Sequence, residues 1–298
     1  MRRTLPLVVL ALAATLAGAC AGTQTVPDAS EATVDPEAWR ATAPAPGPLA
    51  ELVTPKFQRV TLENGLQVLV AQRHDLPIVS VGMAFRAGSS ADPEGKEGLA
   101  QLTYQLILEG AGKRDAVALD EAFADLGTSA WATTGEDGAM IGMEVLSRNL
   151  EEALALLSDV VQKPRFDKSA FDNRKEQHLA NLAAQVGNPR YLAGEAFAEA
   201  VFGEHHPYGR LGSGMPASVS RIQLADAKKF YGKAAGPKAA ALVFAGDISV
   251  ERATELARAW FGKWKGSASP HPAPKAPTVA ARAQVVVVPK PGLAQTVI

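Results

Sequence analysis

The sequence FQRVTLENGLQVLVAQR, residues 57–73, marks where the folded part of the chain begins. Apolar and polar residues alternate on both sides of its central ENG, and Gly65 can take the positive φ that a tight turn requires. The pattern predicts an antiparallel hairpin at the start of a folded domain. The next apolar run, PIVSVGMAFRAGS at residues 77–89, predicts a third strand beside it.

Helical and strand patterns then alternate along the chain. The predicted order is two helices at 98–111 and 115–127, two strands within 129–146, helices at 150–162, about 169–186 and 189–202, then a helix, a strand and a helix at 224–231, 238–247 and 250–261. This order predicts an α+β domain in which the helices pack on one face of a largely antiparallel sheet.

The N-terminus has the pattern of an export signal. Arg2 and Arg3 precede a short apolar run, and LAGAC at residues 16–20 resembles a bacterial lipoprotein signal. We expect residues 1–20 to be a lipoprotein signal peptide with Cys20 as the lipidated residue. The alternative is an ordinary signal cleaved nearby, with Cys20 incidental. Because Ala21 rather than an aspartate follows the cysteine, we expect a lipid anchor in the outer membrane, on the periplasmic side.

Two segments rich in proline and alanine suggest linkers on either side of the domain. Residues 21–50 predict a flexible tether, 51–266 the folded domain, and 267–280 a Pro-rich linker. The valine-rich pattern that follows predicts that residues 281–298 begin a second, truncated domain of similar type.

Composition excludes some classes of function. The formal net charge is -1 over 298 residues, whereas nucleic-acid binders usually carry a basic excess. Cys20 is the only cysteine, so an internal disulfide is excluded and an exported domain must rely on its core.

Several local sequences together resemble the insulinase or pitrilysin metallopeptidases, a family that includes the mitochondrial processing peptidase. The resemblance is carried by VTLENGLQVLV, RAGSSADPEGKEGLA, HHPYGRLGSG, LVFAGDIS and VVVVPKPGLAQTVI, in that order along the chain. It implies a fold in which two similar domains, in one chain or two, enclose a cleft.

The resemblance also implies where an active site would stand. In active members the helix after GLA reads H-x-x-E-H, in which two histidines one helical turn apart hold Zn²⁺ and the glutamate acts as base. Here those positions are Gln101, Tyr104 and Gln105. A further glutamate ligand from a downstream helix corresponds to Asn181, as counted back from Asn188-Pro189.

These replacements remove the chemistry of the zinc site. Neutral amides are poor zinc ligands, and a phenol is a poor general base at neutral pH. We therefore predict no catalytic residues, no metal and no cofactor in this chain, although active family members hold zinc. Because all four replacements are polar, we expect them to face a wet cleft.

Other histidines offer weaker alternatives. Glu204, His205 and His206 form a compact donor cluster, for which a structural turn is the favoured interpretation. His178 with Glu176 is a remote candidate for a substitute metal site, against a simple polar pair on a helix surface. His74 and His271 are expected to be solvated.

The favoured function is that of a non-catalytic subunit of an envelope peptidase complex. It would bind extended peptide, for example by strand addition, and pair as a heterodimer with an active zinc peptidase of the same family. Two alternatives remain open at this point: an active zinc metalloendopeptidase with non-standard ligands, and a peptide-binding envelope module without an enzyme partner.

Overall fold

The computed structural model describes residues 37–43, 45, 47, 56–185, 187–266, 268, 270–277 and 285–289. The chain divides into two compact units, residues 1–53 and 54–298. In the first unit the described residues include one short 3₁₀ helix, η1 (Ala38–Ala41). The predicted signal peptide and Cys20 lie outside the described residues. Within the described residues, no helix combines the length and apolar character needed to cross a membrane.

A six-stranded sheet forms the centre of the second unit. Its spatial order is β1-β2-β8-β3-β7-β6. All neighbours pair antiparallel except β2 and β8, which are parallel. The strands are β1 (Gln58–Thr61), β2 (Gln67–Gln72), β3 (Ile78–Phe85), β6 (Trp131–Thr134), β7 (Ala139–Leu146) and β8 (Ala240–Gly246). The predicted largely antiparallel sheet is confirmed.

The opening hairpin forms as its sequence predicts. Gly65 has φ +90°, and Leu62 and Leu66 close the turn with a backbone hydrogen bond of 2.9 Å. Alternate residues of β2, Val68 and Val70, are fully buried. Their burial fixes the register, because a slip of one residue would expose that whole face of the strand.

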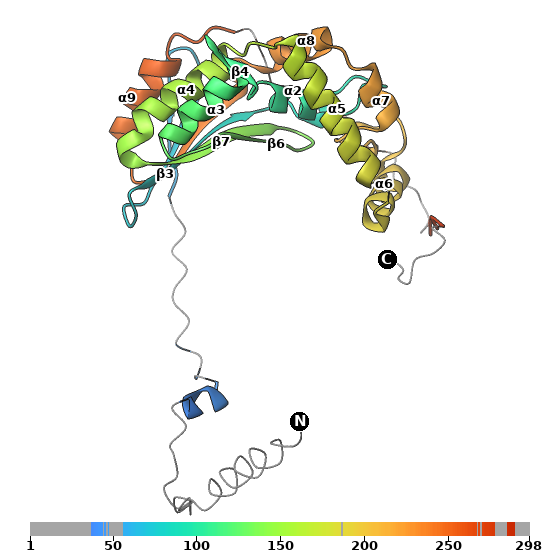
Figure 1. Ribbon diagram of the computed structural model, residues 1–298, viewed down its shortest axis with the longest axis horizontal. Helices are drawn as coiled ribbons and strands as arrows, with labels where there is room; N and C mark the ends of the chain where they lie inside the picture. Colours follow the sequence, from blue (N-terminus) through green and yellow to red (C-terminus); the bar gives the residue numbers. More distant parts are fainter. Residues whose placement is uncertain are drawn as a thin grey trace, which may run out of the picture. The chain divides into compact units, whose positions relative to one another are not determined.

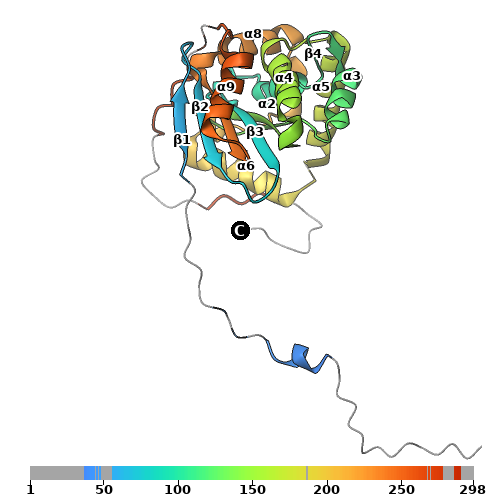
Figure 2. The ribbon, with the colours of Figure 1, turned by 90° about the vertical axis from the view of Figure 1, so that its left-hand side faces the viewer.

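Helices cover one face of the sheet (Figure 1), as predicted. The alternation of β3 places Val79, Val81, Met83 and Phe85 on this covered side. Figure 2 shows β1 and β2 at one edge of the sheet. The helices are α2 (Leu99–Leu106), α3 (Ala116–Asp125), α4 (Leu150–Gln162), α5 (Lys168–Gln185), α6 (Pro189–Phe202), α7 (Pro216–Arg221), α8 (Leu224–Ala234) and α9 (Val250–Phe261).

Two local predictions need correction. The first helix ends at Leu106 rather than near residue 111, because the chain turns into a small hairpin of β4 (Gly110–Ala111) and β5 (Arg114–Asp115). Gly110 has φ +124° there, a conformation that a helix cannot contain. The short helix α7 was not predicted, because six residues carry too little periodicity to be recognised.

The Pro-rich segment after the last helix lies along the domain over its described residues. Ala268 is only 4% exposed. The amide of His271 donates a 2.9 Å hydrogen bond to the carbonyl oxygen of Arg86. We refer to residues 270–277 as the strap.

Candidate functional site

The loop before α2 is held against the turn between β6 and β7. The amides of Ser89 and Ser90 donate to the carbonyl oxygens of Gly135 and Glu136 at 3.0 and 2.8 Å. Gly88 is required at this approach, because a Cβ there would overlap the Gly135 carbonyl oxygen. This contact places the start of α2 near one end of the edge strand β6.

Asp92 then caps α2. Its carboxylate accepts hydrogen bonds from the amides of Gly98 at 2.9 Å and Ala100 at 2.8 Å. Gly98 itself has φ +94°, which a residue with a side chain rarely adopts. Burial raises the pKa of Asp92 to about 7, although the two backbone hydrogen bonds and the charge of Arg210 oppose that shift.

The loop at residues 205–214 wraps this end of α2. Arg210 pairs with Glu97 at 3.1 Å, and both side chains are largely buried. From α5, His178 Nε2 donates 2.7 Å to the carbonyl oxygen of Ser213. His178 is 5% exposed, so its interpretation as a surface polar pair is wrong. It is a buried tie between α5 and the loop, which only the tertiary fold could reveal.

Helix α2 is closed to solvent except at two positions. Of its eight residues only Gln101 and Gln105 are not buried. They lie one turn apart and therefore on the same face of the helix. Within the part of the chain that the structure describes, neither of their side-chain amides makes a hydrogen bond. The two predicted ligand positions thus share an open, polar face.

Tyr104 does not lie on the exposed face of α2 that bears Gln101 and Gln105. It is fully buried and packs against Phe85, Phe230 and Tyr231, with ring centroids 5.4, 5.9 and 6.3 Å away. Its hydroxyl donates 2.9 Å to the carbonyl oxygen of Ala87. The expectation that all four replacements face a wet cleft is therefore wrong for Tyr104. An aromatic ring at this site fills the core, and its hydroxyl is satisfied locally.

The chemistry of Tyr104 follows from its burial. Burial first, and the charge of Asp92 second, raise the pKa of the phenol above its usual value. The hydroxyl remains protonated, and its proton is directed at Ala87. Tyr104 is therefore unable to act as a general base at neutral pH.

Asn181 is exposed on α5, which packs against α2. The contact between these helices is reinforced by an ion pair of Arg174 with Glu109, beyond the end of α2. Arg174 also donates 3.0 Å to the side chain of Gln177. The assignment of Asn181 to the third ligand position stays a prediction.

The side chains present do not fit zinc. Two amides and a buried phenol offer neither imidazole nor carboxylate. The substitute pair is not brought together either, because Glu176 is exposed whereas His178 is buried and bonded to Ser213. Among the described residues, no three His, Cys, Asp or Glu side chains gather into a group that could hold a metal ion.

The edge strand β6 lies beside this helix. Among the residues that the structure describes it pairs with β7 alone, and α2 packs against it. Trp131 is 40% exposed, and its indole lies across Gly142, where a Cβ would collide with the ring. Gly142 pairs in turn with Gly82 of β3, so two glycines lie side by side on adjacent strands. The edge therefore offers unpaired backbone groups beside a flat apolar surface.

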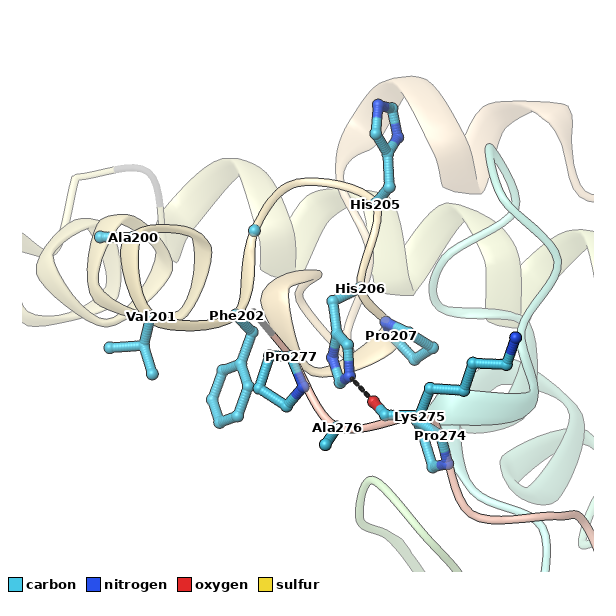
Figure 3. Close-up of a pocket in the computed structure, with 11 residues that line it drawn as sticks. Ala200, Val201, Phe202, His205, His206, Pro207, Pro274, Lys275, Ala276 and Pro277 are labelled. Carbon is cyan, nitrogen blue, oxygen red and sulfur yellow. Dashed lines mark hydrogen bonds between the residues drawn. The ribbon is translucent and has the colours of Figure 1, made fainter. Parts of the chain in front are cut away.

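A cavity lies at the end of α6 (Figure 3). It has a volume of about 670 Å³ and is lined by residues 200–203 and 205–207 and by residues 274–277 of the strap. Its wall is held by His206, whose Nε2 donates 2.8 Å to the carbonyl oxygen of Lys275, while its Nδ1 accepts from the amide of Tyr208 at 3.1 Å. The structural interpretation of the His205–His206 segment is thus confirmed for His206.

The remaining histidines have local roles. His205 points away from His206 in Figure 3 and lies 3.1 Å from Glu94. His74 is partly exposed but pairs with Asp247 at 2.7 Å, so its description as merely solvated is incomplete. This pair lowers the pKa of Asp247, with help from a hydrogen bond donated by Ser147. The side chain of His271 is exposed, as expected.

Comparisons with known proteins fit this architecture. Residues 67–211 match the family described as insulinase, peptidase family M16, and residues 221–298 match the peptidase M16 inactive domain. A crystal structure of a peptidase M16 inactive domain from Pseudomonas fluorescens superimposes with a TM-score of 0.70 and 28% identity, over 75% of this chain and 54% of that one.

Two curated relatives bear on the site. The non-peptidase homolog YmxG of Helicobacter pylori is 26% identical over 185 residues, which are 62% of this chain and 43% of that protein. The probable mitochondrial-processing peptidase subunit beta of Arabidopsis thaliana is 24% identical over 212 residues, 71% of this chain and 40% of that protein. The chain spans about half the length of these relatives or less. On these matches and on its fold, the chain belongs to the insulinase family of peptidases, family M16.

Proposed function

We propose that this chain is a non-catalytic subunit that binds extended peptide and pairs with a zinc-bearing peptidase of its own family. The observation that carries the proposal is the composition of α2. Its open face bears the amides of Gln101 and Gln105, and its third altered position, Tyr104, is part of the core. The fold of an M16 domain is retained while the groups needed for hydrolysis are absent from these positions.

An open sheet edge beside α2 supports the binding role. Over the described part of the chain the edge strand β6 has one free side, and an extended peptide could add to it by main-chain hydrogen bonds. The loop from Gly88 to Asp92, together with the wrapped end of α2, holds the helix beside this edge. These specific contacts, which fix the position of α2, favour a ligand-binding role over a domain that has lost its function.

Pairing with an active subunit is supported by the relatives. One is named a non-peptidase homolog, and another a subunit of a processing peptidase. A chain that confines and orients peptide while its partner cleaves is consistent with both names. Anchoring at the outer membrane through Cys20 belongs to the same proposal and rests on the signal-like sequence at residues 1–20.

The test is recovery of the partner. The full chain, tagged at its C-terminus, is cross-linked in its native membranes, purified, and its partners are identified by mass spectrometry. We expect a homologue with an intact H-x-x-E-H motif to be enriched over a tag-only control. Repeated recovery without any peptidase would contradict the pairing. Zinc-dependent cleavage of peptides by the purified chain alone would contradict its non-catalytic role.

A further inference from the structure

The two glutamines of α2 are placed as a binding pair. Gln101 and Gln105 are the only residues of the helix that reach solvent, and they share one face. Both are partly buried, and neither amide is hydrogen-bonded within the described residues. Because the helix is packed on every other side, the backbone fixes where the two side chains begin, and their amides are available to a ligand.

A primary amide matches a peptide group. It carries an N–H donor and a C=O acceptor side by side, so it can accept from one main-chain N–H and donate to a neighbouring C=O. It bears no charge, and it therefore makes no demand on the sequence of the bound peptide. Two such amides one helical turn apart, about 5–6 Å between Cβ atoms, match the span of roughly two residues of an extended chain.

The edge strand supplies the other half of the site. In a strand added to β6, alternate residues direct their N–H and C=O groups toward β6, and the residues between direct them away. Those outward groups lose water without gaining a partner unless another element approaches. Helix α2 packs against β6, so the two solvent-reaching amides of Gln101 and Gln105 come from an element that lies beside this edge.

We propose that Gln101 and Gln105 form a clamp for the main chain of an extended peptide lying on β6. This inference rests on the proposed function and names its ligand chemistry. The recognised feature is the pair of outward-facing peptide groups, so binding is tolerant of side-chain sequence and independent of metal.

The test uses a fluorescein-labelled ten-residue peptide of alternating valine and serine, with analogues N-methylated at one position each. Binding to the full chain is measured by fluorescence anisotropy. In the parent we expect N-methylation to weaken binding at positions facing β6 and at one or two positions between them. In Gln101→Ala and Gln105→Ala, affinity for the unmodified peptide should fall about fivefold to tenfold, and sensitivity at the intervening positions should disappear.

The controls distinguish the clamp formed by Gln101 and Gln105 from peptide binding at β6 itself. Gln72→Ala, an exposed glutamine at the end of β2, should leave affinity unchanged, and Gln101→Glu, which keeps shape and acceptors, should show an intermediate loss. If the alternating sensitivity persists unchanged in both alanine variants, the clamp is wrong while peptide binding at β6 stands. If the parent does not bind the peptide in the presence of EDTA, both the clamp and the peptide-binding role fail.

Discussion

At position 104 a phenol stands where the family resemblance predicts a catalytic glutamate, and its surroundings explain why a tyrosine is stable there. The side chain is fully buried among three aromatic rings, and its hydroxyl is bonded to Ala87. A glutamate in this position would place a charge in the core without a partner. The residue has become structural, whereas Gln101 and Gln105 have kept access to solvent.

Tyr104→Phe should lower the free energy of unfolding by about 1–3 kcal/mol, because it removes the donor to the Ala87 carbonyl in a buried site. Chemical denaturation of the full chain measures the loss. Tyr208→Phe is the matched control, since the hydroxyl of Tyr208 bonds to Asp137 in an exposed setting, and it should cost less. Equal effects of the two changes would contradict the core role of Tyr104.

Asp92 makes stability depend on pH. Its pKa is about 7 in the folded chain, against an ordinary value of 3.8, because it is buried. Between these values the folded chain holds a proton that the unfolded chain has released, so the contribution of Asp92 to stability is fully present below pH 3.8 and is lost as pH rises through about 7. Across pH 5 to 8 the loss is roughly 2–3 kcal/mol.

Asp92→Asn isolates this contribution. The variant should be less stable than the parent by a smaller margin at pH 8 than at pH 5, because the parent alone must bury a charge at high pH. Denaturation midpoints at both pH values give the two differences. A difference that is the same at pH 5 and pH 8 would show that Asp92 does not titrate in this range.

Among the secondary structures, those with long periodic patterns could be predicted. The hairpin at residues 57–73, and the cap of α3 by Asp115, whose carboxylate accepts 2.9 Å from the amide of Ala118, follow local rules. The early end of α2 and the burial of His178 could not be predicted, because they depend on partners far away in sequence. His178 bonds to a carbonyl 35 residues later.

The position of the strap also depends on a contact between residues far apart in the sequence, the hydrogen bond between His206 and Lys275. His206 accepts from its own loop and donates to Lys275, which needs the neutral Nε2–H form. His206→Leu should remove both bonds and speed hydrogen exchange at the amide of His271, which donates to Arg86 at the start of the strap. His205→Leu is the control and should leave that exchange rate unchanged. Protection that survives in His206→Leu would mean that other contacts hold the strap.

For the second unit taken together, the sheet with helices on one face and the family membership were both predictable, because order and periodicity survive in the sequence. The candidate site was predictable only in part. Gln101 and Gln105 lie where the motif spacing predicts, on one open face. The burial of Tyr104 could not be predicted, because a tyrosine is as compatible with a core position as with a cleft.

The proposed lipidation of Cys20 would place the assembly at the membrane. On this proposal Cys20→Ala should move the chain from the membrane fraction to the soluble periplasmic fraction, because no lipid could then be attached at this position. Fractionation followed by immunoblotting measures the distribution, with incorporation of labelled palmitate as the direct assay. A chain that stays in the membrane fraction without label would contradict the anchor.

Metal content shows whether the predicted ligand positions, Gln101, Gln105 and Asn181, hold zinc. The purified parent and the variant Gln101→His, Gln105→His, Asn181→Glu, which leaves the core residue Tyr104 in place, are dialysed against buffered zinc and measured by mass spectrometry. We predict negligible zinc in the parent and near-equimolar zinc in the variant. Equimolar zinc in the parent that is lost in Gln105→Ala would contradict the account.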